Sequence, residues 1–150
     1  MKTLVIYDTL YGYTEKIARA IGGAVEGEVK VVKVGEAVVD DVAAYDFIFV
    51  GSPTQGGRHT KALQAFLKEL PAEALKNKQA AAFDTRMKSM WVKLFGWAAN
   101  HIADVLKEKG ASLVAPGEGF LVKTGKGPLV DGEEERAGEW AKKLADEVMK

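Results

Sequence analysis

The chain alternates between short apolar runs and segments of helical periodicity from one end to the other. Residues 47–50 (Phe-Ile-Phe-Val) are continuously apolar, as expected of a strand buried on both faces of a parallel sheet. Residues 29–34 alternate between apolar and polar side chains, which is typical of an edge strand with one solvated face. Because strands that alternate with helices form parallel sheets covered on both faces, we predict a three-layer, doubly wound α/β fold with five parallel strands.

The other expected elements complete this pattern. Strands are predicted at residues 2–8 and 79–83, and a fifth strand at 111–115 and 120–123 is interrupted by Pro116-Gly117-Glu118-Gly119. Helices are predicted up to about residue 24 with a break at Gly22-Gly23, around residues 63–70, and at 98–109 and 131–150. The 150 residues contain no linker or repeat, so we expect a single domain spanning residues 1–150.

Composition narrows the possible chemistry. The formal net charge is zero, which gives no indication of a nucleic-acid or anionic-membrane partner, and no apolar run is long enough to span a bilayer. Cysteine is absent, which excludes disulfides, thiol catalysis and metal–thiolate sites. Any redox chemistry must therefore come from a bound organic cofactor. The first residues resemble a strand rather than a signal peptide, so a cytoplasmic location is expected.

The turn after the first strand is the strongest functional signal. The run Leu4-Val5-Ile6-Tyr7 leads into a turn that contains hydroxyl groups and glycine and opens at once into a helix. This arrangement directs backbone N–H groups and the positive end of a helix dipole at one point, which favours a phosphate. The alternative is that Thr14 is a plain N-cap without a ligand. The residues expected to hold the phosphate are Thr9, Leu10, Tyr11, Gly12, Tyr13 and Thr14.

Two further loops should converge on the same point, because ligands of open parallel sheets lie beyond the carboxyl ends of the strands. The loop after the third strand is open at Gly56-Gly57 and can present backbone groups to the edge of a planar heterocycle. The loop after the fourth strand contains Trp91, Phe95 and Trp97, of which Trp91 is the favoured stacking residue and Trp97 is expected in the core. The residues expected to frame the heterocycle are Ser52, Pro53, Thr54, Gln55, Gly56, Asp84, Thr85 and Arg86.

The spacing Thr9-x-x-Gly12-x-Thr14 resembles the T-x-T-G-x-T phosphate loop of flavodoxins, and Gly51-Ser52-Pro53-Thr54 resembles their second loop. Tyr11 stands where the flavodoxin pattern has its second Thr, and bulky residues there are similar to the flavodoxin-like domain of flavodiiron proteins. The resemblance covers almost the whole chain. It implies the strand order 2-1-3-4-5, the cofactor FMN, and electron transfer to a redox partner protein or a small quinone-like acceptor.

Two alternatives remain open at this point. The first is an FMN-dependent quinone or protoporphyrinogen oxidoreductase, with a second pocket formed by the loop at residues 87–90. The second is a non-redox interaction domain that has the fold but has lost the flavin, which the departure at Tyr11 favours. His59 and His101 have no partners at ligand or triad spacing, so we expect structural roles for them, with no catalytic residue and no metal site.

The sign of charge near the expected flavin leads to a redox prediction. Arg86, Lys88 and Lys93 are basic, and no acidic residue lies between Thr85 and Trp97. Positive charge stabilises an anionic reduced flavin, so we expect a second-electron potential less negative than that of acidic flavodoxins. A very low potential for that step in a redox titration would contradict this expectation. The alternative is that these side chains simply point into water.

Overall fold

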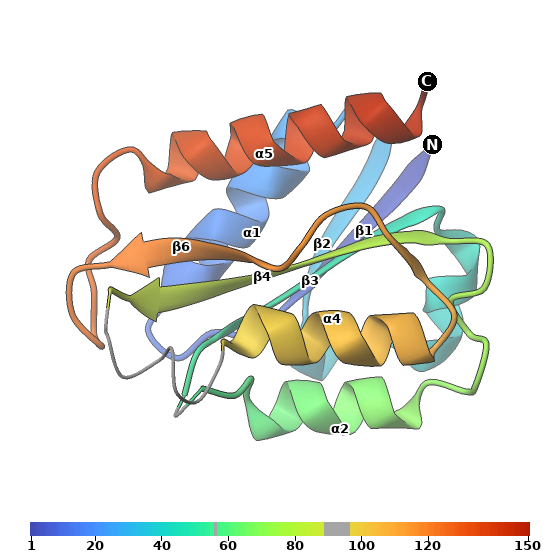
Figure 1. Cartoon of the computed structure of the whole chain (residues 1–150), viewed down its shortest axis with the longest axis horizontal. Coiled ribbons are helices and arrows are strands. Elements are labelled where there is room, and N and C mark those ends of the chain that lie inside the picture. The colour runs from blue at the N-terminus through green and yellow to red at the C-terminus, as the bar shows by residue number, and fades with distance from the viewer. Residues whose placement is uncertain (56, 89–96) are drawn as a thin grey trace.

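The computed structural model describes residues 1–55, 57–88 and 97–150. A parallel sheet forms its centre, in the order β2-β1-β3-β4 followed by β5 and β6, which both pair with β4 (Figure 1). The strands are β1 (Lys2–Tyr7), β2 (Glu28–Lys33), β3 (Phe47–Pro53), β4 (Gln79–Met87), β5 (Ser112–Leu113) and β6 (Glu118–Val122). The predicted order 2-1-3-4-5 and the interrupted fifth strand are confirmed.

The interruption of the fifth strand spans residues 114–117, two residues earlier than expected. Both β5 and β6 run parallel to β4, and Glu118 and Gly119 already pair with Phe83 and Asp84. The ladder resumes at Glu118 because glycine is accepted in a strand where another group approaches its backbone closely. At Gly119 that group is the guanidinium of Arg86, whose atoms lie where a Cβ would stand.

Helices cover both faces of the sheet. In Figure 1, α1 and α5 lie on one side and α2 and α4 on the other, which gives the predicted three layers. The helices are α1 (Tyr13–Ala24), α2 (Lys61–Glu69), α4 (Ala98–Glu108) and α5 (Glu133–Val148), with the 3-10 turns η1 (Val34–Glu36) and η2 (Val39–Ala44) between β2 and β3. Within the described ranges, none of the helices is long and apolar enough to cross a bilayer.

The glycine pair in α1 does not break that helix, contrary to expectation. Gly22 and Gly23 both lie inside the helix, which continues to Ala24. A Cβ on Gly22 would stand 2.5 Å from a methyl carbon of Val31 in β2. The residue therefore serves close packing of helix on sheet, and the packing outweighs the weak intrinsic helix propensity of glycine.

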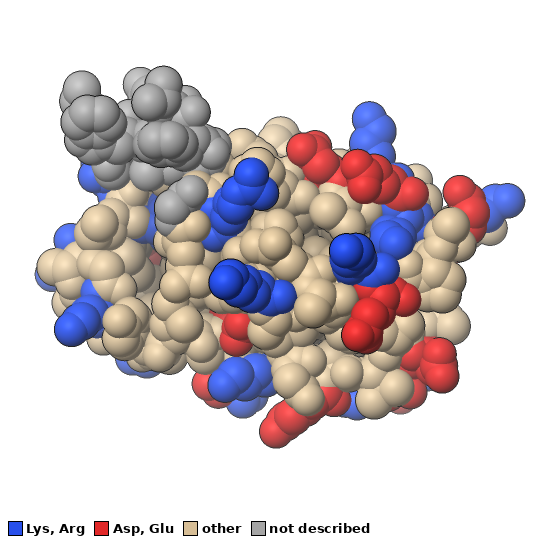
Figure 2. Space-filling view, turned by 90° about the horizontal axis from the view of Figure 1, so that it is seen from below, with Lys and Arg blue, Asp and Glu red and all other residues tan. Residues whose placement is uncertain are grey.

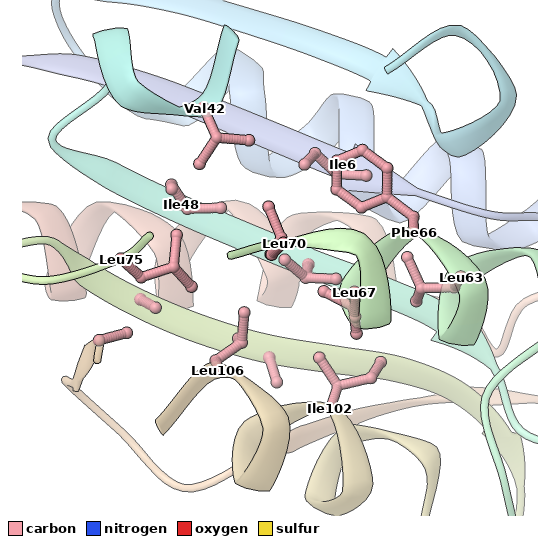
Figure 3. Packing of buried hydrophobic residues seen from close by; sticks show 14 of the residues in the cluster. Ile6, Val42, Ile48, Leu63, Phe66, Leu67, Leu70, Leu75, Ile102 and Leu106 are labelled. Atoms are coloured by element: carbon pink, nitrogen blue, oxygen red, sulfur yellow. The ribbon is translucent and has the colours of Figure 1, made fainter. Parts of the chain in front are cut away.

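Two hydrophobic cores fix the sheet between its helix layers. Ile6, Ile48, Leu63, Leu67 and Ile102 belong to the core under α2 and α4, which Figure 3 shows. The core under α1 and α5 is aromatic, with Trp140 packed edge-on against Phe49, Phe83 and Phe120. Because β1, β3 and β4 are packed on both faces, the carboxyl ends of these strands form a rigid platform for the loops that follow.

One glycine at this platform supports a stability prediction. A Cβ on Gly51 would lie 2.1 Å from a ring carbon of the fully buried Phe83, and the Gly51 carbonyl accepts a hydrogen bond from the Asp8 N–H. We expect Gly51→Ala to lower the free energy of unfolding by about 1–3 kcal/mol through overpacking, measured by urea denaturation. Gly35→Ala is the matched control, since a Cβ there meets nothing within 4 Å. Equal effects of the two substitutions would contradict the packing argument.

Candidate functional site

The loop between β1 and α1 leaves the start of α1 without a side-chain cap. Gly12 is the N-cap residue, with φ of 90°, and no side chain of the described residues caps the helix there. The Gly12 N–H donates to Thr9 Oγ1 at 2.8 Å, which closes the loop on itself. Among hydrogen bonds between described residues, none uses the N–H groups of Leu10, Tyr11, Tyr13 or Thr14. This group of free donors at a helix N-terminus suits an anion.

The loop between β1 and α1 is exposed to solvent at residues 10 and 11 and packed against a second turn at Tyr13. Leu10 and Tyr11 are about half exposed, at 51% and 54%. A Cβ on Gly12 would meet no atom within 4 Å. Tyr13 instead packs against the turn at residues 124–127. Its ring lies so close to Gly127 that a Cβ on that glycine would overlap it. An anion can therefore approach the donors from outside while the loop is supported from behind.

Thr14 connects the loop to β4. Its hydroxyl is buried and hydrogen-bonded to the hydroxyl of Thr85 at 2.8 Å. Sequence reasoning expected both residues at the site, and the structure brings them together. The bond fixes the first turn of α1 against the end of β4. Thr14 is therefore not the N-cap of the alternative interpretation, because Gly12 occupies that position.

Sequence reasoning missed a buried hydrogen-bond network beneath the loops. Asp8 accepts the Thr60 hydroxyl and the Thr9 N–H, and the Thr60 N–H donates to the Ser52 hydroxyl at 3.0 Å. Thr60 also caps α2 by accepting the Leu63 N–H. The position of Thr60 just before an apolar helical run was a usable signal for the cap, whereas nothing local pointed to the pairing with Asp8. The network ties the loop after β1 to the loop after β3.

The second predicted segment is divided between a strand and a tight turn. Ser52 and Pro53 belong to β3 rather than to a loop, and Ser52 is fully buried. Thr54 binds β4 by donating its N–H to the Thr85 carbonyl at 2.9 Å. Gln55 and Arg58 exchange two backbone hydrogen bonds around the turn that follows. The predicted residue Gly56 lies outside the described residues, as do Trp91, Phe95 and Lys93.

The third predicted segment also continues a strand, since Asp84, Thr85 and Arg86 all belong to β4. Asp84 is fully buried, and its carboxylate accepts two hydrogen bonds from the Arg86 guanidinium, at 2.6 and 2.7 Å. It also accepts the Ala99 N–H in the first turn of α4 at 3.0 Å. Burial raises the pKa of Asp84, while the Arg86 guanidinium and the Ala99 N–H counteract that rise. These contacts join β4 to α4.

Arg86 contacts two further groups. Its guanidinium carbon lies 3.7 Å from the centre of the Trp97 ring, in cation–π contact, and the missing side chain of Gly119 leaves room for the guanidinium. Trp97 is half-buried against this cation, rather than in the core as expected. The polar groups of the Asp84 and Arg86 side chains thus bind each other, and Asp84 also binds the start of α4. Their roles at a flavin ring edge stay a prediction.

The ion pair corrects one premise of the redox prediction. We counted Arg86 as a cation without an acid to offset it, but Asp84, two residues earlier and on the same side of β4, carries the opposing charge. The two residues neutralise each other because alternate residues of a strand share one face. Among the described residues, only the exposed Lys88 remains of the three cations.

The two histidines pair with each other. The His59 and His101 rings are stacked, with centroids 6.4 Å apart and planes 18° from parallel. His59 is buried, and within the part of the chain that the structure describes its Nδ1 has no hydrogen-bond partner. Burial, with smaller effects from the charges of His101 and Arg58, lowers the pKa of His59 to about 4. His59 is therefore neutral near pH 7.

The geometry defines a class of protein. An open parallel sheet carries an uncapped helix start beyond β1, next to the loop after β3, at the switch point where doubly wound proteins bind phosphorylated cofactors. The sequence model of the flavodoxin domain matches residues 4–91, more than half of the chain. The chain belongs to the flavodoxin family.

Solved structures agree with this assignment. A flavodoxin from the domain Archaea is 25% identical, with a TM-score of 0.83 and all of both chains covered. Flavodoxin 2 from Bacillus cereus is 25% identical, with a TM-score of 0.82 over 98% of this chain and 99% of that one. The Flv1 flavodiiron core from Synechocystis sp. PCC6803 shares the fold at 19% identity, with a TM-score of 0.78 over 99% of this chain and 36% of the other. No curated protein matches the sequence.

Proposed function

We propose that this chain binds FMN, with the phosphate on residues 9–14, and that it carries electrons between redox partners. The observation that supports this most directly is the uncapped start of α1, where the N–H groups of residues 10, 11, 13 and 14 have no partner among the described residues. Free donors at a helix N-terminus suit a phosphate dianion better than an uncharged group. FMN, when bound, would supply the one- and two-electron chemistry.

The chain's own contribution is to bind, orient and shield. The Thr9 hydroxyl holds the Gly12 N–H and so keeps the turn in the shape that presents the other donors. The network of Asp8, Ser52 and Thr60 fixes the loop after β3 beside it. We assign residues 52–55 and 84–86 to the edges of the flavin ring. In flavodoxins such loops frame the flavin, and this resemblance supports the assignment.

A charge placed in the loop tests the phosphate assignment. Leu10 is exposed, so Leu10→Asp adds a carboxylate beside the donors without disturbing the core. We expect FMN affinity to fall by about 10- to 100-fold, from Coulomb repulsion at a partly solvated site. Quenching of flavin fluorescence on titration of the apoprotein measures this. Leu10→Asn is the control variant and should stay within about threefold of the parent.

Riboflavin serves as the control ligand, because it has the flavin ring but no phosphate. Leu10→Asp should leave riboflavin binding unchanged if the carboxylate acts on the phosphate alone. An apoprotein that binds neither flavin would overturn the proposal and favour an interaction domain. Rapid turnover of quinones with a nicotinamide reductant by the FMN-loaded protein would favour an oxidoreductase instead.

A further inference from the structure

Four exposed cations lie in the loops at the carboxyl edge of the sheet. Met87, the last residue of β4, is in register with Val122, the last residue of β6. Lys88 and Lys123 are the residues that follow these two. The two lysines therefore leave neighbouring strands side by side. Lys126 lies in the turn at residues 124–127, which packs on Tyr13. Arg58 follows the turn after β3. We call Arg58, Lys88, Lys123 and Lys126 the basic rim.

Among the described residues, the loops that carry the basic rim contain one exposed acid, Asp131, in the connection between β6 and α5. All four side chains are exposed, and none forms an ion pair with another described residue. Asp8 and Asp84, which belong to the same edge, are buried and hydrogen-bonded, so they present no charge to a partner. The exposed acids Glu36, after β2, and Glu134 and Glu135, in the first turn of α5, lie outside these loops.

The chain as a whole is neutral, with 21 basic and 21 acidic residues. A basic edge on a neutral chain therefore means that charge is polarised along the molecule. On the face shown in Figure 2, acidic side chains are concentrated away from the end where the strands terminate, and Lys and Arg side chains are prominent at that end. Such polarity steers a charged partner to one edge.

Exposed apolar side chains lie at the same edge as the basic rim. Leu10, Tyr11 and Met87 are exposed at 51%, 54% and 45%, and all three belong to the carboxyl ends of β1 and β4 or the loop that follows. Exposed apolar groups inside a charged rim are typical of a protein interface, where the apolar centre gives affinity and the rim gives orientation. A small anion would use the charge but not the apolar side chains.

We propose that this edge docks a protein whose contact surface is rich in Asp and Glu. The basic rim would pair with those carboxylates while Leu10, Tyr11 and Met87 contact the partner's apolar centre. The proposal deepens the electron-carrier function and rests on it for the partner's redox role, but the docking itself requires no flavin. The proposal specifies the charge of the partner's surface, since a basic partner would be repelled from this edge.

Cytochrome c offers a matched pair of probes, because succinylation converts its lysines into carboxylates and reverses its surface charge. We expect the full-length apoprotein to bind succinylated cytochrome c at least about tenfold more tightly than native cytochrome c at low ionic strength, with the difference lost at high salt. Amide chemical shifts in NMR spectra should change in residues 9–13, 57–60, 87–88 and 122–127. Equal binding of both probes, or shift changes elsewhere, would overturn the proposal.

Charge reversal supplies the matched variants. Lys88→Glu with Lys123→Glu should weaken binding of the succinylated probe by about tenfold or more. Lys30→Glu with Lys143→Glu changes the net charge equally at exposed positions in β2 and α5, and should change binding less than about twofold. The same loss in both variants would overturn the assignment, as would tighter binding of a single-stranded DNA oligonucleotide. Because the readout is binding by the apoprotein, failure to bind FMN and failure of the basic rim are separate results.

Discussion

Asp84→Ala is expected to lower the free energy of unfolding by about 3–5 kcal/mol, because it leaves a buried cation without its counter-charge. Arg86 is only 13% exposed, and both of its short hydrogen bonds go to Asp84. The Ala99 N–H at the start of α4 loses its acceptor as well. Chemical denaturation followed by far-UV circular dichroism measures the loss.

A double variant separates the ion pair from the rest of the site. Asp84→Leu combined with Arg86→Met removes both charges and keeps apolar groups against Trp97 and Gly119. The double variant should be clearly more stable than Asp84→Ala, since replacing both partners of a buried pair by apolar groups is often close to neutral. A loss below about 1 kcal/mol for Asp84→Ala would show that Arg86 escapes to solvent, and the role of the pair would have to be abandoned.

The second large effect is a pH dependence that comes from His59. Its pKa in the folded protein is lowered to about 4 from the usual 6.5, chiefly by burial. The unfolded chain therefore binds the proton more readily than the folded protein, and stability falls as pH is lowered through that window. As the pH is lowered from about 6.5 to about 4, we expect the titration of His59 to lower the free energy of unfolding by about 3 kcal/mol. Above pH 6.5 its contribution is constant.

His59→Phe is the variant that tests this, because it retains a ring in the buried site but does not titrate. Between pH 7 and pH 4.5 the free energy of unfolding of this variant should fall by roughly 2–3 kcal/mol less than that of the parent protein. Carboxylates elsewhere affect both proteins alike and cancel in the difference. His101→Gln removes only the smaller electrostatic cause, so it should leave most of the pH dependence. Parallel pH profiles for His59→Phe and the parent would rule out His59 as the source.

Much of the fold could be predicted because the determining interactions repeat along the chain. The continuous apolar run at residues 47–50 predicted a central strand, and the alternation at 29–34 predicted an edge strand. The turn before α1 was also visible locally, because a strand, a glycine turn and a helix follow each other within a few residues, whereas the absence of a side-chain cap came from the structure. Predictions of the cofactor residues themselves remain to be tested by flavin titration.

What the sequence determined by itself is the succession of strands and helices along the chain and the place of the glycine turn before α1, to which we assign a phosphate. Both follow from periodicity and from neighbours in the chain. Only the tertiary structure decided which side chains neutralise or cap one another. Arg86 is paired with Asp84 because β4 continues beyond the predicted strand end and places both on one face. Thr60 reaches Asp8, and His59 stacks on His101, across separations that no local pattern encodes. Those contacts form only when the sheet brings the carboxyl ends of its strands together, because hydrogen bonds and burial depend on distance in space and not on distance along the chain.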